Sequence, residues 1–371
     1  LQRKGDNDPP DGGRTAWMVV LASWLVHFVV FGIMYSWGKW QSYYSTVLPS
    51  TSSEISLIGT VSFASIFLFG IPAGRLAECI GFRRTVLCGT MCLILGLVLG
   101  AFSTHHVQLV LTQGLLVGLG SSLIYFPSVS VPAQWWRDRR SFATGVAASG
   151  AGVGSVAFTA LTDALLGGGL GHRSTLLALG VTSFSMLVLA VELMKTRIAK
   201  PPRRPFVEMM RWAVDLDVFR NRQFVPLMVA VFFNAFGSLI PFYFLPAFTT
   251  YLSLPISLGP LLLTIANIAS TFGRILVGLL ADTLGNLNSL LLTLFFQSAA
   301  CFGLWLWLPT PAGLISFAAL FGFMSGGYIS LMPSVTAQVC GVAKLPSSIG
   351  LVFSGMMLGH LLGPPMAAGM V

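Results

Sequence analysis

Long apolar segments alternate with short polar ones along almost the whole chain. Each apolar segment reaches roughly 20 residues, the length that an α-helix needs to cross the hydrocarbon core of a bilayer. The pattern predicts eleven membrane-spanning helices, at 16–44, 55–77, 84–104, 107–132, 141–166, 172–194, 224–250, 257–283, 288–308, 311–337 and 347–371.

One long polar segment, residues 195–223, divides these helices into a group of six and a group of five. Its FVEMMRWAV sequence is typical of a short amphipathic helix lying on a membrane surface, and a plain basic linker explains the segment equally well. The sequence therefore predicts a tail at 1–15, an N-terminal bundle at 16–194, this linker, and a C-terminal bundle at 224–371.

The composition agrees with a membrane protein, because 55% of the residues are hydrophobic and only 9% are charged. A soluble domain of this size needs a charged surface. The 40 glycines and 20 prolines lie largely inside apolar segments, where neighbouring membrane helices satisfy freed backbone groups. The five cysteines lack the spacing of a metal site, so we expect neither a metal nor another cofactor.

The positive charge of the chain is an orientation signal. With the N-terminus on the cytoplasmic side, Arg173 is the only Lys or Arg in an outer connection, and Lys39 and Arg274 lie within or at the end of spans. The other basic residues gather at the inner ends, as the positive-inside rule requires. We therefore expect a multi-pass protein of the plasma membrane with a cytoplasmic N-terminus, and no nucleic-acid partner.

A short motif occurs twice, as GRLAECIG after the second span and as GLLADTLG after the eighth. An acidic residue between two glycines at a helix end suits tight packing and pairing with a helix dipole or an arginine. Two similar halves predict a substrate site between them near the midplane of the membrane. The residues assigned to this conformational motif are Gly74, Arg75, Glu78, Gly81, Arg83, Arg84 and Asp282, with Arg139 and Arg140 before the fifth span.

This arrangement resembles the major facilitator superfamily, whose loops after helices two and eight carry the same signature. The resemblance implies an all-α membrane protein of two pseudo-symmetric six-helix bundles, of which eleven spans are visible and the twelfth is missing. It also implies transport by alternating access. Because the second motif copy lacks counterparts of Arg83 and Arg84, we expect weaker gating salt bridges there.

Further motifs resemble the monocarboxylate transporter family, especially its fungal branch. They cover nearly the whole chain: PPDGGRTAW before the first span, WWRDRRSFATGVAASGAGVG at the fifth, VDLDVFRNRQF before the seventh and LLGPPMAAG in the eleventh. The fifth-span motif is the most specific, and its Gly145, Gly150 and Gly154 have the small-residue spacing of a close helix contact. The resemblance implies a small carboxylate as substrate.

Arg274 is the strongest candidate for binding that substrate. It lies about 13 Å from the inner end of the eighth span, where an uncompensated arginine costs at least about 2.5 kcal/mol. Its planar guanidinium suits recognition of a carboxylate, and by resemblance it aligns with the substrate-binding arginine of the family. Ser270 and Tyr35 stand where the family has an aspartate and a lysine, so Asn267 or Ser270 is the expected partner of the empty Arg274.

Weaker candidates complete the site. Lys39, one turn beyond Tyr35, could reach inward, while Tyr125 and Asn234 are candidate pocket donors. His27 and Asp163 are candidates for proton coupling, although structural roles explain both. His360 is equally ambiguous.

We therefore expect a monomeric secondary transporter of a small mono- or dicarboxylate, with protons as a candidate co-substrate and the bilayer as its environment. Nucleotide-binding and hydrolase motifs such as GxxxxGK[ST], HExxH and GxSxG are missing, which argues against an enzyme. Three alternatives stay open: a fungal exporter of itaconate or a secondary metabolite, a riboflavin-like carrier, and a solute sensor that does not transport. A dicarboxylate would use Lys39 as its second cation.

Overall fold

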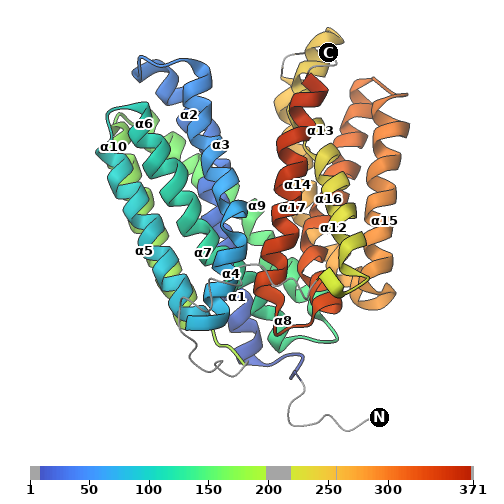
Figure 1. The fold of residues 1–371 in the computed structure, drawn as a ribbon. Helices are drawn as coiled ribbons and strands as arrows, with labels where there is room; N and C mark the ends of the chain where they lie inside the picture. Colours follow the sequence, from blue (N-terminus) through green and yellow to red (C-terminus); the bar gives the residue numbers. More distant parts are fainter. Residues whose placement is uncertain (1–8, 198–218, 256, 369–371) are drawn as a thin grey trace.

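The computed structural model describes residues 9–197, 219–255 and 257–368. These residues form helices and short connections, and they gather into two groups that Figure 1 shows standing side by side. The predicted amphipathic FVEMMRWAV helix lies outside the described residues.

The first group follows the chain from the N-terminus. Its helices are α1 (Arg14–Tyr35), α2 (Trp37–Val47), α3 (Ser52–Leu68), α4 (Gly70–Ile80), α5 (Phe82–Ala101), α6 (His106–Leu109), the π-helix η1 (Val110–Leu116), α7 (Val117–Ser130), α8 (Pro132–Trp135), α9 (Arg140–Gly167) and α10 (Gly171–Leu193).

The second group follows the polar linker. Its helices are α12 (Phe224–Ser238), α13 (Ile240–Tyr251), α14 (Leu258–Leu284), α15 (Asn286–Ala299), the π-helix η3 (Ala300–Trp305), α16 (Pro311–Cys340) and α17 (Leu345–Ala368).

Ten helices in the described part are long and apolar enough to cross a membrane, and one bent pair brings the number to eleven. The prediction of an all-helical membrane protein with about eleven spans is therefore confirmed. The bent pair is α3 and α4, which meet at an angle of 46° on either side of Phe69. Pro72, in the first turn of α4, has no N–H to continue the ladder of α3, which accounts for the bend.

The seventh predicted span consists of α12 and α13 on either side of Leu239, and the two together form one candidate span, Phe224–Tyr251. Pro241 lies in the first turn of α13, where proline is tolerated because that N–H would have no helical partner. The prediction of one span at 224–250 is therefore confirmed.

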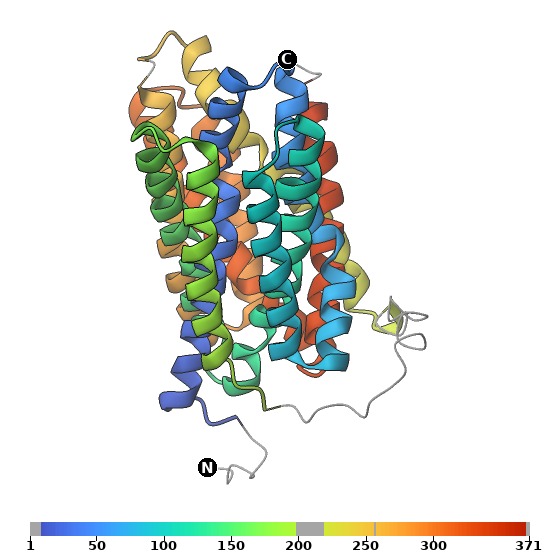
Figure 2. The same cartoon turned by 90° about the vertical axis from the view of Figure 1, so that its left-hand side faces the viewer.

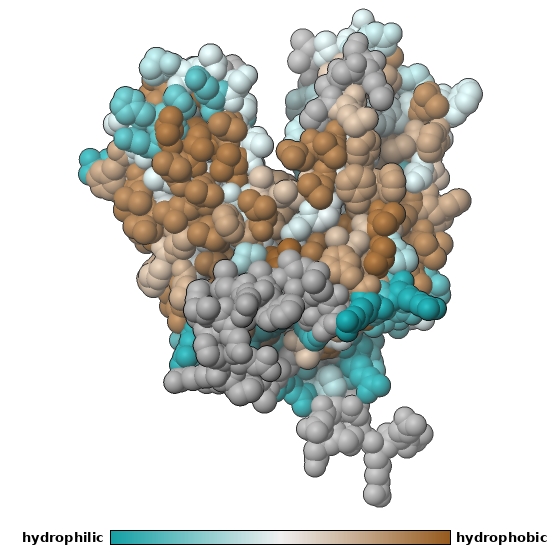
Figure 3. All heavy atoms as spheres, in the orientation of Figure 1, coloured by the Kyte–Doolittle hydropathy of each residue, from teal (hydrophilic) through white to brown (hydrophobic). Residues whose placement is uncertain are grey.

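The two groups meet at one end of the molecule and separate at the other. We call the meeting end the base; it holds the start of α1 at Arg14 and the end of α14 at Leu284. We call the opposite end the mouth; it holds α2 and α13. The spans run between these ends in both ribbon views (Figures 1 and 2). In the space-filling view an open cleft with mainly apolar walls narrows from the mouth toward the base (Figure 3).

Candidate substrate site

Arg274 lies on α14 where the two helix groups touch. Its side chain is buried, with 6% of the residue exposed, and its Nη1 donates a hydrogen bond of 2.6 Å to the carbonyl oxygen of Ala148 on α9. The buried Nε has no partner among the described residues. The guanidinium thus bridges the two groups through a neutral acceptor, and part of its donor capacity is unused.

The close approach of α9 to α14 explains why a backbone carbonyl reaches Arg274. A Cβ at Gly145 would overlap the carbonyl oxygen of Arg274, and a Cβ at Gly278 would overlap that of Ser141. The same glycine-rich helix packs on α1, since Cβ atoms at Gly150 and Gly154 would overlap carbonyl oxygens of α1. The predicted role of the glycines in helix contact is confirmed.

The expected partners of Arg274 were wrong. Asn267 is exposed and lies seven residues toward the mouth on the same helix face, or about 10 Å away along the axis, too far for a direct hydrogen bond. Ser270 is buried and its backbone packs on α16, because a Cβ at Gly326 would overlap its carbonyl oxygen. The acceptor is the Ala148 carbonyl instead.

Two predicted residues from the other group surround the guanidinium. His27 on α1 and Tyr125 on α7 are buried and lie within electrostatic range of Arg274. The ring centroids of this pair are 5.3 Å apart, edge to face. The Nδ1 atom of His27 donates to the carbonyl oxygen of Ser23 at 2.8 Å, since a carbonyl oxygen only accepts.

Phe353 on α17 completes the contact between the groups at this level and was missed by sequence reasoning. Its ring stacks on Phe67 of α3 at 5.7 Å and meets Tyr125 and Phe126 edge to face at 6.0 and 5.8 Å. The sequence alone does not distinguish a phenylalanine at the contact between the groups from one that faces lipid.

A smaller polar group lies within the C-terminal helices. Asn234 lies on α12 and Tyr328 on α16. The Nδ2 atom of Asn234 and the Oη atom of Tyr328 are buried, and neither makes a hydrogen bond of standard geometry within the described ranges. His360 on α17 shares a hydrogen bond of 3.2 Å with Ser238. Tyr328 was not predicted; its position midway along a spanning helix is the signal that would have indicated it.

Lys39 and Asp163 lie near the mouth and pair with each other. Their Nζ and Oδ1 atoms are 2.6 Å apart, and the two side chains are 43% and 62% exposed. Lys39 therefore does not reach inward toward Arg274. Tyr35, the residue one turn before it, is also largely exposed.

At the base the two motif copies make equivalent contacts across the groups. The carboxylate of Asp282 on α14 accepts hydrogen bonds of 2.9 Å from the backbone N–H groups of Ser141 and Phe142, in the first turn of α9. The carboxylate of Glu78 on α4 accepts one of 3.1 Å from the N–H of Ser347, in the first turn of α17. Each acid therefore satisfies free N–H groups and the positive dipole end of a helix in the opposite group.

The glycine that ends each motif copy has the same conformation. Gly81 and Gly285 have φ angles of 96° and 92°, which glycine adopts without the strain that a side chain would bring. These two glycines end α4 and α14 directly after the acid-bearing turn.

Two basic residues of the first copy form ion pairs within the N-terminal group. Arg83 pairs with Glu192 of its own group at 3.0 Å, and Arg75 pairs with Glu78 on the same helix. Arg84 is exposed. Across the groups, the carboxylates of Glu78 and Asp282 accept from helix ends in both copies.

The remaining predicted motif residues lie beside this contact. Arg139 precedes α9, and Arg140, the first residue of α9, donates from its Nε to the carbonyl oxygen of Trp136 at 3.2 Å. Both lie within electrostatic range of Asp282. The acidic-Gly-Gly entry docks nearby, because Asp11 accepts from the N–H groups of Arg137 and Asp138.

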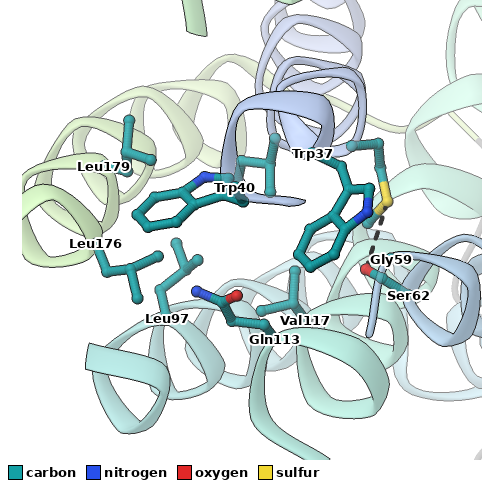
Figure 4. Close-up of a pocket in the computed structure, with 11 residues that line it drawn as sticks. Trp37, Trp40, Gly59, Ser62, Leu97, Gln113, Val117, Leu176 and Leu179 are labelled. Atoms are coloured by element: carbon teal, nitrogen blue, oxygen red, sulfur yellow. Dashed lines mark hydrogen bonds between the residues drawn. The ribbon is translucent and has the colours of Figure 1, made fainter. Parts of the chain in front are cut away.

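A separate small pocket lies inside the N-terminal group, away from Arg274. Figure 4 shows Trp37, Trp40, Leu97, Gln113 and Leu179 around it. Its walls are mainly apolar and come from helices of one group, so it does not bridge the cleft.

Comparisons with known proteins agree with this architecture. The chain is 30% identical over 364 residues to MFS-type transporter 1 of Ophiocordyceps sp. (strain BCC 1869), covering 98% of this chain and 80% of that protein. It is 30% identical over 359 residues to the aspyridones efflux protein apdF of Emericella nidulans, covering 96% and 72%.

A solved structure has the same fold. The crystal structure of the human organic anion transporter MFSD10 (TETRAN) matches with a TM-score of 0.76 at 17% identity, covering 98% of this chain and 94% of that one. The family profile described as Major Facilitator Superfamily matches residues 15–368. The chain is therefore a multi-pass transporter, not an enzyme, and belongs to the Major Facilitator Superfamily.

Proposed function

We propose that this protein is a secondary transporter of small organic anions, and that Arg274 binds the anionic group of the substrate. The observation that carries the proposal is the position of the guanidinium: it is buried between the two helix groups, with a neutral carbonyl as its partner and an unpaired Nε. The motifs that resemble monocarboxylate transporters support a carboxylate as the anionic group.

The partner of Arg274 suggests how binding drives the conformational change. A carboxylate carries a full negative charge and can accept two parallel hydrogen bonds from a guanidinium, whereas a backbone carbonyl is neutral and offers one oxygen atom. A substrate carboxylate therefore competes well with the Ala148 carbonyl on α9. Loss of that contact loosens α14 from α9, and the groups can then rock about the bound anion, in the manner of alternating access.

The test is uptake of labelled mono- and dicarboxylates into proteoliposomes. We expect Arg274→Gln to lower the rate at least about 100-fold, because a buried anion without its cation costs about 3 kcal/mol or more. Arg274→Lys should retain a small part of the activity, since lysine keeps the positive charge but cannot form the two parallel hydrogen bonds of a guanidinium.

Arg173→Gln is the matched control. Arg173 lies over the ring of Phe102 at 4.2 Å near the mouth and takes no part in the proposed site, so uptake should match the parent protein. Elution volume and unfolding temperature establish that each variant folds. Undiminished uptake by a folded Arg274→Gln protein would remove Arg274 from the mechanism.

We favour export over import as the direction of transport, with a fungal secondary metabolite as the transported molecule. Relatives that match most of the chain are named as efflux proteins, among them the aspyridones efflux protein and the fujikurins efflux protein of Gibberella fujikuroi. With a cytoplasmic N-terminus, the mouth faces the outside of the plasma membrane. Cells that express the parent chain should then accumulate less of a loaded organic acid than cells that express Arg274→Gln.

A further inference from the structure

Three aromatic rings form a continuous stack along α1. The ring centroids of His27 and Phe31 are 6.0 Å apart with an interplanar angle of 26°, and those of Phe31 and Tyr35 are 5.7 Å apart at 29°. The residues are four apart, so their side chains lie above one another on one helix face. We call these three residues the aromatic ladder.

The ladder rises from the level of Arg274 toward the mouth. Its lowest residue, His27, lies within electrostatic range of Arg274, and α1 runs from the base to the mouth (Figure 1). Eight residues separate His27 from Tyr35, which corresponds to about 12 Å along the helix axis. The ladder therefore extends about 12 Å from His27, which lies near the buried cation, toward the open end of the cleft.

The lower rings are covered and the highest ring is open. Tyr125 packs edge to face on both His27 and Phe31, at 5.3 and 5.2 Å, and both rings are buried. Tyr35 is 45% exposed. In the described part of the chain, Phe31 is the ring that stacks on Tyr35.

The open ring lies near residues of both groups. Tyr35 lies within electrostatic range of Tyr125 on α7 and also of Tyr243 on α13, and these two tyrosines belong to opposite groups. Tyr243 is 64% exposed. The next position of the ladder, Lys39, instead turns to Asp163 after the helix is interrupted at Ser36, so the stack ends at the exposed ring of Tyr35.

Building on the proposed role of Arg274, we infer that the transported anion carries a planar aromatic or conjugated ring about 10 Å from its anionic group, and that this ring packs against Tyr35 while the anionic group reaches Arg274. Offset-stacked and edge-to-face ring pairs are more favourable than their buried area alone explains. A saturated ring of similar size fills the same space but lacks this additional stabilisation by ring pairing. The ladder therefore selects for unsaturation in the substrate.

The test compares two acids of equal length whose outer ring lies about 10 Å from the carboxylate, 3-(biphenyl-4-yl)propanoate and its fully saturated counterpart, 3-(bicyclohexyl-4-yl)propanoate. Binding to the purified full chain is measured by calorimetry. We expect the aromatic acid to bind about three- to ten-fold more tightly than the saturated acid. Tyr35→Leu should remove this preference with little change in the affinity for the saturated acid, whereas Tyr35→Phe should keep it.

Tyr251→Leu is the matched control. Tyr251 is exposed at the end of α13, where it stacks on Phe248, and the preference should be unchanged there. Retention of the preference in a folded Tyr35→Leu protein would overturn the inference. So would equal binding of the two acids to the parent chain.

Arg274→Gln separates the inference from the proposed function. If this variant binds neither acid and the parent chain binds both equally, the proposed anion transport by way of Arg274 is retained and the selection for an aromatic ring is rejected. Undiminished binding of both acids by Arg274→Gln, or no binding by the parent chain, would overturn both.

Discussion

Lys39 and Asp163 form an ion pair at the mouth that is open to solvent on both sides, with 43% and 62% of the side chains exposed. Pairs of this kind contribute about 0–1 kcal/mol. We expect Lys39→Gln to leave the unfolding temperature within about 2 °C of the parent value and to leave uptake of monocarboxylates largely intact, as measured in the same proteoliposomes as the Arg274 variants.

Asp163→Asn is the companion variant, because it breaks the same pair from the other side. The two variants should behave alike if the pair is their shared feature. A loss of uptake in Lys39→Gln as deep as in Arg274→Gln would instead assign Lys39 to the site, as a dicarboxylate would require.

At the scale of single residues, the sequence predicts the cation and not its partner. Arg274 is recognisable because a charged residue in the middle of an apolar span raises the free energy of insertion into the membrane, and such residues usually have a function. Its acceptor is a main-chain carbonyl at Ala148, and any residue type can supply a carbonyl. That contact depends on how closely α9 approaches α14, which the glycine at 145 permits and which no local pattern specifies.

Helix ends hold the base together. Asp282 caps α9 with two hydrogen bonds and Glu78 caps α17 with one. Asp282→Asn keeps the shape of the side chain and removes its charge, which should weaken the closed base by about 1 kcal/mol. The population of molecules with an open base should rise accordingly, by about five-fold.

The measurement is the rate at which a maleimide labels Ser347→Cys in a chain without its five native cysteines. Ser347 is buried at the base, so labelling reports opening. We expect Asp282→Asn to increase the rate more than Glu78→Gln does. Glu192→Gln is the control, since Glu192 pairs within its own group. Labelling of Asp282→Asn at the parent rate would show that the carboxylate does not hold the base closed.

At the scale of elements, hydropathy predicts the helices because each buries its backbone in lipid and so must be continuous and apolar. The bend beside Phe69 was not predicted, although Pro72 was visible in the sequence. Proline is common in membrane helices, so its presence alone does not distinguish a bend from a straight helix. The motif repeat predicted contacts at the base, while the choice of helix N-termini over salt bridges became clear only from the packing.

At the scale of the whole molecule, one glycine-rich helix, α9, packs closely both within its own group and across the two groups. On α9, Gly154 packs on α1 within the N-terminal group, and Gly145 packs on α14 across the groups. Gly154→Val should lower the unfolding temperature, because overpacking within a rigid bundle costs about 1–3 kcal/mol.

Gly145→Val should act differently, because the groups can separate where the new side chain intrudes. We expect an unfolding temperature near that of the parent and faster labelling of Ser347→Cys. Equal destabilisation by both variants would mean that the two groups do not move as separate bodies.

The neutral partner of Arg274 has a consequence for the energetics of the empty carrier. A peptide carbonyl does not take up a proton in the range where cells live, and a guanidinium does not release one. The bond between Arg274 and Ala148 is therefore equally strong in acidic and alkaline surroundings, unlike a bond to an aspartate. Acidity therefore acts on this contact from outside it, through the ionised fraction of the organic acid that reaches the guanidinium and through His27 nearby.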